Sequence, residues 1–477
     1  MEEQRREKKH FPILPVVLCG IVILILAVYA GGMYHYRSHF LPGTVIDGMD
    51  VSGMTLKELE EQVQNYMLRI VERKADGTTL EEDIQGKDIS LGYTAIAPVK
   101  EILDQQNIWL WFVRREQSYD METHLSYREE LLEEKIRSLV GFQEDYAVAP
   151  TDAYIAEYDP KAGFAVVPET QGSLLNWEKT CQTIKDAVGR LKETVNLEAA
   201  GCYEVPAVTT ESPELLEALE EIQGYKNVQI TYLFGENKEI LDGETISSWL
   251  LVDGFDVSLD QNQVDAYVAA LRRRYDSIFR PRTFHTSYGK EITIEGGDYG
   301  WWMNYGQEAE ELAAMIERGE SGERTPVYYQ TAAAYGTPDY GTTYVEINLT
   351  AQHLFLYQDG ELILESDFVS GNSSKGYDTP VGVYGITYKQ RNATLTGEDY
   401  ETPVSYWMPF NRNVGMHDAS WRRTFGGNIY KTNGSHGCIN LPSSVAKELY
   451  SYVEKGTPVI CYELPGTESV SLEKLAK

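Results

Sequence analysis

The segment "TYVEINLTAQHLFLYQDGELILESDFVSG", residues Thr343–Gly371, alternates apolar and polar side chains on both sides of the dipeptide Asp359-Gly360. Alternation with a period of two is typical of strands that bury one face. An Asp-Gly pair between two such runs indicates a tight hairpin turn. The next segment, "TPVGVYGITYKQ" (Thr379–Gln390), predicts a further strand. The pattern therefore predicts a β-sheet domain in the last third of the chain.

Helical periodicity returns only once in this region, in "SSVAKELYSYVEKG", where Gly456 is a typical helix terminator. The segment "TPVICYE" that follows predicts a closing strand, and Cys461 is expected to be buried within it. We predict one mostly-β domain over residues 343–463, with a short tail over residues 464–477.

The middle of the chain contains two similar segments. "GFAVVPETQGSLLNWEKTCQTIKDAV" and "KEITIEGGDYGWWMNYGQEAEELAAMI" each lead from an apolar strand through a glycine turn into a helix that begins at an asparagine. Gly172 and Asn176 recur as Gly300 and Asn304 at one common offset of 128 residues. A unit of this size indicates a domain duplication rather than a solenoid, whose repeats are shorter.

The duplication predicts two α+β stem domains, over residues 40–205 and 210–331, joined to the β domain by a linker over residues 332–342. The stem is expected to begin with a short hairpin in "FLPGTVIDGMDVSGMT". The Trp301-Trp302 pair after the second glycine turn is compatible with a ligand platform, although tryptophans more often serve packing.

The N-terminus predicts a membrane segment. Residues 1–10 carry several basic side chains, and residues 11–34 contain no charged residue. That length allows a helix to cross about 30 Å of hydrocarbon, with the basic flank in the cytoplasm. The alternative is a cleaved signal peptide, because Val28-Tyr29-Ala30 fits a cleavage site. We favour an uncleaved anchor, and either interpretation places the chain from Leu41 onward outside the cell.

Composition narrows the partners and the chemistry. The formal net charge is −31, and most of the excess lies between Leu41 and Gly341, which argues against nucleic acid as a partner. The 5 cysteines are too few for a disulfide-stapled exported domain. Cys181 and Cys202 are candidates for one pair, which the sequence leaves open. No metal-ligand cluster and no cofactor motif is recognisable.

The segment "KTNGSHGCIN", residues Lys431–Asn440, has the composition of a nucleophile turn. A catalytic cysteine needs a base or a positive environment, together with hydrogen-bond donors for an oxyanion. Gly437 before Cys438 permits an unusual backbone conformation, and the amides of both residues are candidate oxyanion donors. Taken alone, however, a free cysteine is more often a small buried hydrophobe.

Two histidines are candidates for the base. His436 is close in sequence, but His417 in "NVGMHDASWRRTF" is the better candidate because it stands at a predicted strand end. Asp418 is placed to orient the imidazole, but it would equally serve as a structural carboxylate, and a backbone carbonyl holds a histidine tautomer as well.

The segment "MHDASWRRTFGGNIYKTNGSHGCINLP" resembles the signature of the L,D-transpeptidases, the YkuD-like cysteine acyltransferases of bacterial cell walls. Their pattern is a histidine, a spacer, and then Ser/Thr-His-Gly-Cys, an apolar residue and Asn or Arg. Here 17 residues separate His417 from Ser435. The duplicated stem resembles the peptidoglycan-binding domains that precede this catalytic domain in Gram-positive members.

The resemblance implies a mechanism for each residue. Cys438 would attack the peptide bond between the L-centre and the D-centre of a tetrapeptide stem and release D-alanine, with His417 as general base and acid. Ser435, His436 and Gly437 would support the site and hold the oxyanion. A side-chain amine of a second stem peptide would then capture the thioester and form a 3→3 cross-link.

An aromatic and basic group is expected around the substrate groove. Its members are Tyr406, Trp407, Trp421, Arg422 and Arg423. Packing is the simpler role for the aromatic rings, and Arg423 is the candidate for contact with a substrate carboxylate. Asn440 is expected to fix the turn and to contact substrate.

Two other functions fit the same residues. Water instead of an amine as acceptor would make the protein an L,D-carboxypeptidase. A non-catalytic wall-binding protein would use the stem and not the cysteine. The predicted partners are peptidoglycan stem peptides and the cytoplasmic membrane, with the C-terminal domains extracellular and facing the cell wall.

Overall fold

The computed structural model describes residues 13–121, 124–397 and 401–468. The chain divides into two compact units, one of residues 1–156 and 165–216 and the other of residues 157–164 and 217–477. The predicted cytoplasmic tail, residues 1–10, and the end of the C-terminal tail lie outside the described residues.

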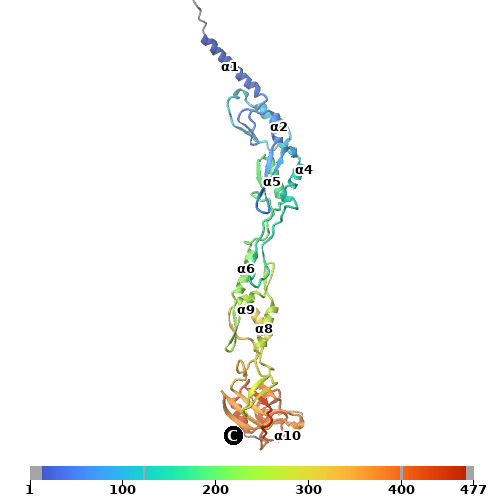
Figure 1. Cartoon of the computed structure of the whole chain (residues 1–477), viewed down its shortest axis with the longest axis vertical. Helices are drawn as coiled ribbons and strands as arrows, with labels where there is room; N and C mark the ends of the chain where they lie inside the picture. The colour runs from blue at the N-terminus through green and yellow to red at the C-terminus, as the bar shows by residue number, and fades with distance from the viewer. Residues whose placement is uncertain (1–12, 122–123, 398–400, 469–477) are drawn as a thin grey trace, which may run out of the picture. The chain divides into compact units, whose positions relative to one another are not determined.

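The first helix, α1 (Ile13–His35), is the candidate membrane segment. Its residues Leu14–His35 are long and apolar enough to cross a membrane, by length and composition. Their apolar side chains are exposed on the helix surface, as a helix surrounded by lipid would have them. The helix extends from the first unit (Figure 1).

The first unit combines short sheets with amphipathic helices. The expected entry hairpin is present, because β1 (Thr44–Ile46) pairs antiparallel with β2 (Met49–Asp50). A three-stranded sheet follows in the order β10-β3-β4, with β3 antiparallel to β4 and parallel to β10. The strands of this sheet are β3 (Met67–Arg73), β4 (Thr79–Gln85) and β10 (Thr194–Asn196). The other elements of the unit are α2 (Leu56–Gln64), β5 (Gly92–Tyr93), α3 (Ile96–Gln105), β6 (Gln117–Tyr119), β7 (Leu125–Ser126), α4 (Glu129–Arg137), β8 (Tyr154–Ile155), β9 (Val166–Val167) and α5 (Trp177–Gly189).

The second stem domain repeats this topology. Its sheet has the order β12-β11-β18, again with one antiparallel and one parallel neighbour of the central strand. Its elements are α6 (Pro213–Lys226), β11 (Ile230–Phe234), β12 (Asn237–Leu241), α7 (Gly243–Ser247), β13 (Leu250–Asp253), β14 (Asp256–Leu259), α8 (Gln261–Tyr275), β15 (Arg282–His285), β16 (Glu291–Ile294), β17 (Trp302–Met303), α9 (Tyr305–Glu317), β18 (Gly322–Arg324) and β19 (Tyr328–Gln330).

The predicted duplication is confirmed at its two marker positions. Asn176 caps α5 by accepting from the Lys179 amide at 3.0 Å, and Asn304 caps α9 by accepting from the Gln307 amide at 3.3 Å. Both preceding glycines have a positive φ, +61° at Gly172 and +135° at Gly300. Each stem unit therefore uses the same turn and cap to lead into its helix.

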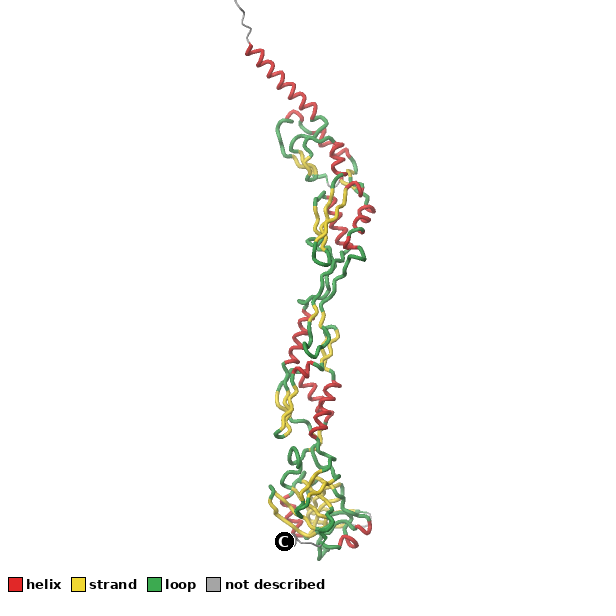
Figure 2. Tube along the Cα trace, in the orientation of Figure 1, coloured by secondary structure: helices red, strands yellow, loops and turns green. Residues whose placement is uncertain are grey.

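The C-terminal domain is the strand-rich part of the chain (Figure 2). One sheet has the order β22-β21-β20-β28-β23 and the other the order β24-β25-β26-β27. The elements are β20 (Tyr344–Asn348), β21 (His353–Gln358), β22 (Glu361–Asp367), β23 (Gly382–Gly385), β24 (Gln390–Thr396), β25 (Glu401–Asn411), β26 (Val414–Asp418), α10 (Ile429–Asn433), β27 (Ile439–Leu441), α11 (Ser443–Tyr452) and β28 (Pro458–Tyr462). Apolar residues from both sheets and from α11 form one core, so the mostly-β prediction is confirmed.

Two local predictions for this domain are also confirmed. The β21–β22 hairpin turns at Asp359 and Gly360, and both have positive φ, 52° and 85°, as such a two-residue turn requires. Cys461 lies in β28 and is fully buried. The sequence left open whether Cys181 and Cys202 pair; in the structure both are free thiols, and the Cys202 Sγ donates to Thr183 Oγ1.

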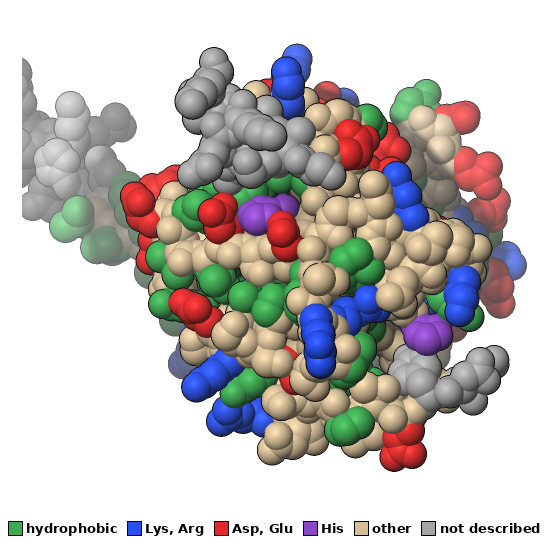
Figure 3. Space-filling model, turned by 90° about the horizontal axis from the view of Figure 1, so that it is seen from below, with side chains coloured by type: hydrophobic (Ala, Val, Ile, Leu, Met, Phe, Trp, Pro, Cys, Tyr) green, Lys and Arg blue, Asp and Glu red, His purple; other side chains and the backbone are tan. Residues whose placement is uncertain are grey.

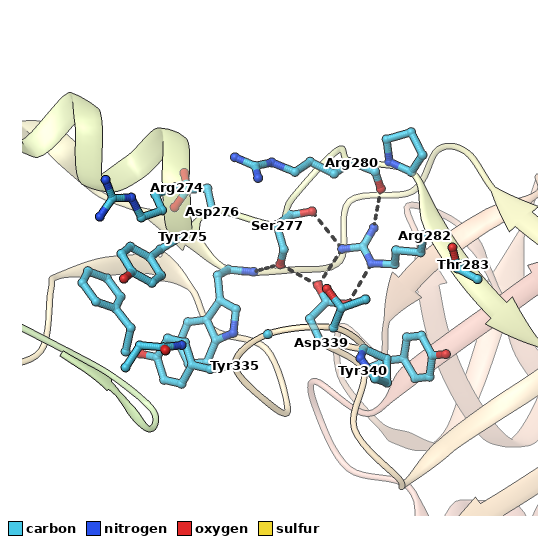
Figure 4. Close-up of a pocket in the computed structure, with 17 residues that line it drawn as sticks. Arg274, Tyr275, Asp276, Ser277, Arg280, Arg282, Thr283, Tyr335, Asp339 and Tyr340 are labelled. Carbon is cyan, nitrogen blue, oxygen red and sulfur yellow. Dashed lines mark hydrogen bonds and ion pairs between the residues drawn. The ribbon is translucent and has the colours of Figure 1, made fainter. Parts of the chain in front are cut away.

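Within the second unit, the segment between stem and β domain is held by buried polar contacts. Arg282 and Asp339 form an ion pair at 2.8 Å with both side chains almost fully buried, and Figure 4 shows them facing each other beside Ser277. These residues line a cavity of about 370 Å³. The stem also extends the sheet edge at β23, because the Tyr299 amide donates to the Val383 carbonyl at 3.1 Å.

The two adjacent tryptophans of the second stem domain have different environments. Trp301 is 8% exposed and stacks on Tyr335 at 3.8 Å between ring centroids. Trp302 is 36% exposed and lies against Tyr329. Packing therefore accounts for Trp301, whereas Trp302 keeps an accessible ring.

Candidate active site

Strand pairing brings the segment that contains His417 next to the segment that contains the "SHGC" motif. β26 runs antiparallel to β25 and parallel to β27, and the register places His417 beside Asn440. Cys438 stands immediately before β27, and the parallel register places it beside Gly415 near the start of β26, two residues before His417. Residues from both strands line a cavity of about 210 Å³, so the structure brings His417 and Cys438 into one pocket.

Cys438 is withdrawn from water in this pocket. Its side chain is 8% exposed and packs with Ala393, Val404 and Trp407, and its Sγ donates to the Asn413 carbonyl at 3.5 Å. Burial raises the pKa of the Cys438 thiol to about 11, because the thiolate loses hydration. The Cys438 side chain is therefore a neutral thiol at neutral pH.

His417 is held in one tautomer. Its Nδ1 lies 2.9 Å from the Asp418 carbonyl oxygen, and because a carbonyl only accepts, Nδ1 carries the proton and Nε2 is the basic nitrogen. The ring lies between two indoles, 5.8 Å from Trp407 and 6.0 Å from Trp421 between centroids. Burial lowers the pKa of His417, so this residue is a neutral base at rest.

The Asp418 carboxylate has a structural partner instead of the imidazole. Its Oδ1 accepts from the backbone amides of Ser405 and Tyr406, at 2.7 and 2.8 Å. The carboxylate thus ties β26 to β25, and the carbonyl of the same residue orients His417. The geometry removes Asp418 as the orienting acid of a triad.

The turn that presents Cys438 is closed by side-chain hydroxyls. Ser435 Oγ donates to the Cys438 carbonyl at 2.5 Å and accepts from the Gly437 amide at 3.0 Å. Thr379 Oγ1 donates to the Gly437 carbonyl at 2.7 Å. Gly437 has φ +117°, which other residues rarely adopt.

These bonds alter the expected oxyanion hole. The amides of Gly437 and Cys438 were both candidate oxyanion donors, but the Gly437 amide already donates to the Ser435 Oγ. The two amides are therefore not equivalent. Among the described residues, no acceptor is recorded for the Cys438 amide. The Cys438 amide is therefore the better placed of the two for an oxyanion.

The segment of residues 370–372, which lies outside the named strands, holds the turn at close range. The Ser435 amide donates to the Ser370 carbonyl and the Asn372 amide donates to the Ser435 carbonyl, both at 2.9 Å. A Cβ on Gly371 would lie 1.7 Å from the Tyr377 carbonyl oxygen. The same Cβ would lie 3.0 Å from the Gly437 Cα, so the close approach of this segment to the turn favours glycine.

The remaining expected substrate residues divide into two groups. Trp421, His436 and Asn440 line the pocket, and Trp421 is 50% exposed. Tyr406 packs against Tyr450, 5.5 Å between centroids, outside the lining. In the space-filling view of this part of the protein, acidic and basic side chains are interspersed over the surface (Figure 3).

The basic residue of the pocket is Arg422 rather than Arg423. Arg422 is among the lining residues, whereas Arg423 is exposed and absent from the lining. The sequence places the two side by side and does not distinguish them. The sequence predicts a strand in the "TPVGVYG" segment, but it gives no sign that Thr379 supports the turn.

Comparison with known proteins decides the family. Residues 342–461, which contain both His417 and Cys438, match the YkuD family, described as the L,D-transpeptidase catalytic domain. The chain belongs to the L,D-transpeptidase family. Residues 104–196 and 210–324 match the family described as "Putative peptidoglycan binding domain", which agrees with the duplicated stem.

Two solved structures from Enterococcus faecium are similar to different lengths of this chain. The crystal structure of a mutant Enterococcus faecium L,D-transpeptidase is 38% identical, covering 52% of this chain and all of that chain, with a TM-score of 0.44. The ertapenem-acylated catalytic domain from E. faecium is 48% identical over 26% of this chain and 98% of that chain, with a TM-score of 0.24.

L,D-transpeptidase 2 of Mycobacterium tuberculosis is 30% identical over 89 residues, 19% of this chain. The match spans only 20% of the length of that curated relative. The catalytic-domain match and the two stem matches are the basis for the function proposed below.

Proposed function

We propose that this protein is a peptidoglycan L,D-transpeptidase that forms 3→3 cross-links through a thioester on Cys438. The observation that carries the proposal is the pairing, in one pocket, of a presented thiol with a histidine whose Nδ1 is committed to the Asp418 carbonyl. A neutral thiol and a neutral imidazole are the correct starting states for general-base activation of a nucleophile.

The chemistry follows from these states. His417 Nε2 takes the thiol proton as Cys438 Sγ attacks the carbonyl carbon between the third and fourth residues of a tetrapeptide donor. The Cys438 amide stabilises the oxyanion, with Ser435, His436 and Gly437 supporting the turn. The C–N bond then breaks, His417 protonates the leaving amine, and D-alanine departs.

The second half-reaction returns the enzyme. An amine from the side chain of an acceptor stem attacks the thioester carbon and gives its proton to His417. The C–S bond breaks, and the thiolate recovers that proton. Capture by water would give a tripeptide and make the protein an L,D-carboxypeptidase, which is the second candidate.

We further propose that α1 anchors the protein in the cytoplasmic membrane with the N-terminus inside. The length and composition of Leu14–His35 support an anchor, and the basic residues ahead of it support the orientation. The two stem domains would then hold the catalytic domain at the wall. A signal peptide is the alternative, and N-terminal sequencing of the protein from membranes separates the two.

The test of the activity uses the full-length protein in detergent with a disaccharide-tetrapeptide, followed by mass spectrometry. A cross-linked dimer with loss of D-alanine is expected from the wild type, and none from Cys438→Ala. Tripeptide alone would establish the carboxypeptidase. Absence of both products and of any covalent carbapenem adduct would leave a non-catalytic wall-binding protein.

A further inference from the structure

Arg422 has an unusual environment for a cation. Its Nη1 donates to the Asn433 carbonyl at 2.8 Å, but its Nε is buried and has no partner among the described residues. Burial lowers the pKa of Arg422, and no acidic side chain among the described residues opposes that effect. A guanidinium partly withdrawn from water without a carboxylate is costly, unless a ligand supplies the counter-charge.

A second polar group in the same pocket also lacks a partner. The Asn440 side chain is 2% exposed, and its Oδ1 forms no hydrogen bond with the described residues. The large majority of buried side-chain polar atoms in native proteins have a hydrogen-bond partner. A donor on Arg422 and an acceptor on Asn440 are thus both unpaired beside Cys438. A ligand that fits this pocket would therefore carry an acceptor for Arg422 and a donor for Asn440.

We propose that Arg422 binds the C-terminal carboxylate of the donor peptide and that Asn440 Oδ1 accepts from an N–H of the same donor. The inference rests on the proposed function, which supplies a donor ending in D-alanine. That carboxylate stands one residue, about 3.6 Å of extended chain, beyond the bond that Cys438 attacks. The planar guanidinium matches a carboxylate with two parallel hydrogen bonds.

This placement gives a reason for choosing a tetrapeptide. A donor one residue longer would carry its carboxylate past Arg422 and would leave an uncharged amide opposite the guanidinium. Arg422 is thus a specificity residue that recognises where the donor ends.

The same contact affects the base. The charge of Arg422 acts with burial to lower the pKa of His417, because it opposes the imidazolium. A bound carboxylate offsets that charge, so His417 becomes a stronger base when the donor is present. Donor binding would in this way favour transfer of the Cys438 proton.

The experiment compares two donors that differ only at the terminus, a disaccharide-tetrapeptide with a free carboxylate and its C-terminal amide. The full-length wild type, Arg422→Gln, Arg422→Lys and the matched control Arg423→Gln are each assayed for the Cys438 thioester by intact mass. Loss of a charged hydrogen-bond pair predicts that the wild type prefers the carboxylate by about 10- to 100-fold in kcat/KM.

Arg422→Gln is expected to react with both donors at the rate of the amide, Arg422→Lys to keep part of the preference, and Arg423→Gln to behave as wild type. Alkylation of Cys438 by uncharged iodoacetamide at the wild-type rate shows that each variant keeps an intact site. If the wild type does not discriminate, or Arg422→Gln still does, the inference is wrong while the activity stands. If the wild type forms no thioester with either donor, the proposed function fails as well.

Discussion

The reactivity of Cys438 should depend on pH as that of a buried neutral thiol does. From a pKa of about 11, the thiolate fraction is about 10⁻⁴ at pH 7 and about 10⁻² at pH 9, compared with about 3% at pH 7 for an ordinary cysteine. The rate of alkylation is therefore expected to rise about tenfold per pH unit from pH 6 to pH 9.5, without a plateau.

The assay treats the full-length protein with iodoacetamide at each pH, stops the reaction, and quantifies the peptide that contains Cys438 by mass spectrometry. Cys461 is an internal control, because it is fully buried in β28 and should react only after denaturation. His417→Ala should change the rate less than about threefold, because a neutral imidazole holds no thiolate at rest.

A preformed thiolate–imidazolium pair would give a different curve. Alkylation would then reach a plateau near pH 6 to 7 and would fall strongly in His417→Ala, as in cysteine enzymes whose thiol pKa is depressed. That result would refute the reasoning from burial, and it would require the site to open or to take up water before it reacts.

Three other variants test the supports of the site and of the stem. Asp418→Ala leaves the Ser405 and Tyr406 amides without their acceptor, which costs about 1–3 kcal/mol per group, so the melting temperature should fall. If Asp418→Asn instead lowers kcat about 10⁴-fold with normal stability, the carboxylate orients the catalytic histidine. Thr379→Val removes the hydroxyl that joins Gly371 and Gly437. It should lower kcat in the thioester assay while alkylation of Cys438 continues. An unchanged kcat would contradict the role of Thr379 in supporting the turn. Asn304→Ala should cost about 1 kcal/mol in urea unfolding through loss of the α9 cap, measured against Gln307→Ala, and equal costs would show that the cap is not what stabilises the helix start.

Predictions that depend on neighbours in sequence agreed well with the structure. The Asp359-Gly360 hairpin, the asparagine caps at Asn176 and Asn304, and the strand that carries His417 next to its last residue are set by turn chemistry, capping and periodicity, which act within a few residues. The "SHGC" motif likewise predicted a glycine turn, and Gly437 has a positive φ beside the pocket that Cys438 and His417 line.

Features that depend on residues distant in sequence could not be predicted in the same way. Arg422 and Arg423 differ only in the direction that the chain takes after β26, so their sequence context cannot say which one enters the pocket. The partner of the Asp418 carboxylate comes from β25 and that of the Gly437 carbonyl from Thr379. Neither contact exists until the strands are paired.

The sequence by itself predicted the strands, the duplicated stem and the apolar N-terminal segment, and it singled out the turn at Cys438 and the histidine His417 as candidates for the site. All of these follow from periodicity, local turn chemistry and a motif carried on a short segment. Only the tertiary structure decided the states of the reacting groups, because burial raises the pKa of Cys438 and lowers that of His417, and burial is a property of the packed sheets. The same packing leaves the Arg422 Nε and the Asn440 Oδ1 without a hydrogen-bond partner among the described residues, in a pocket where a ligand can meet them.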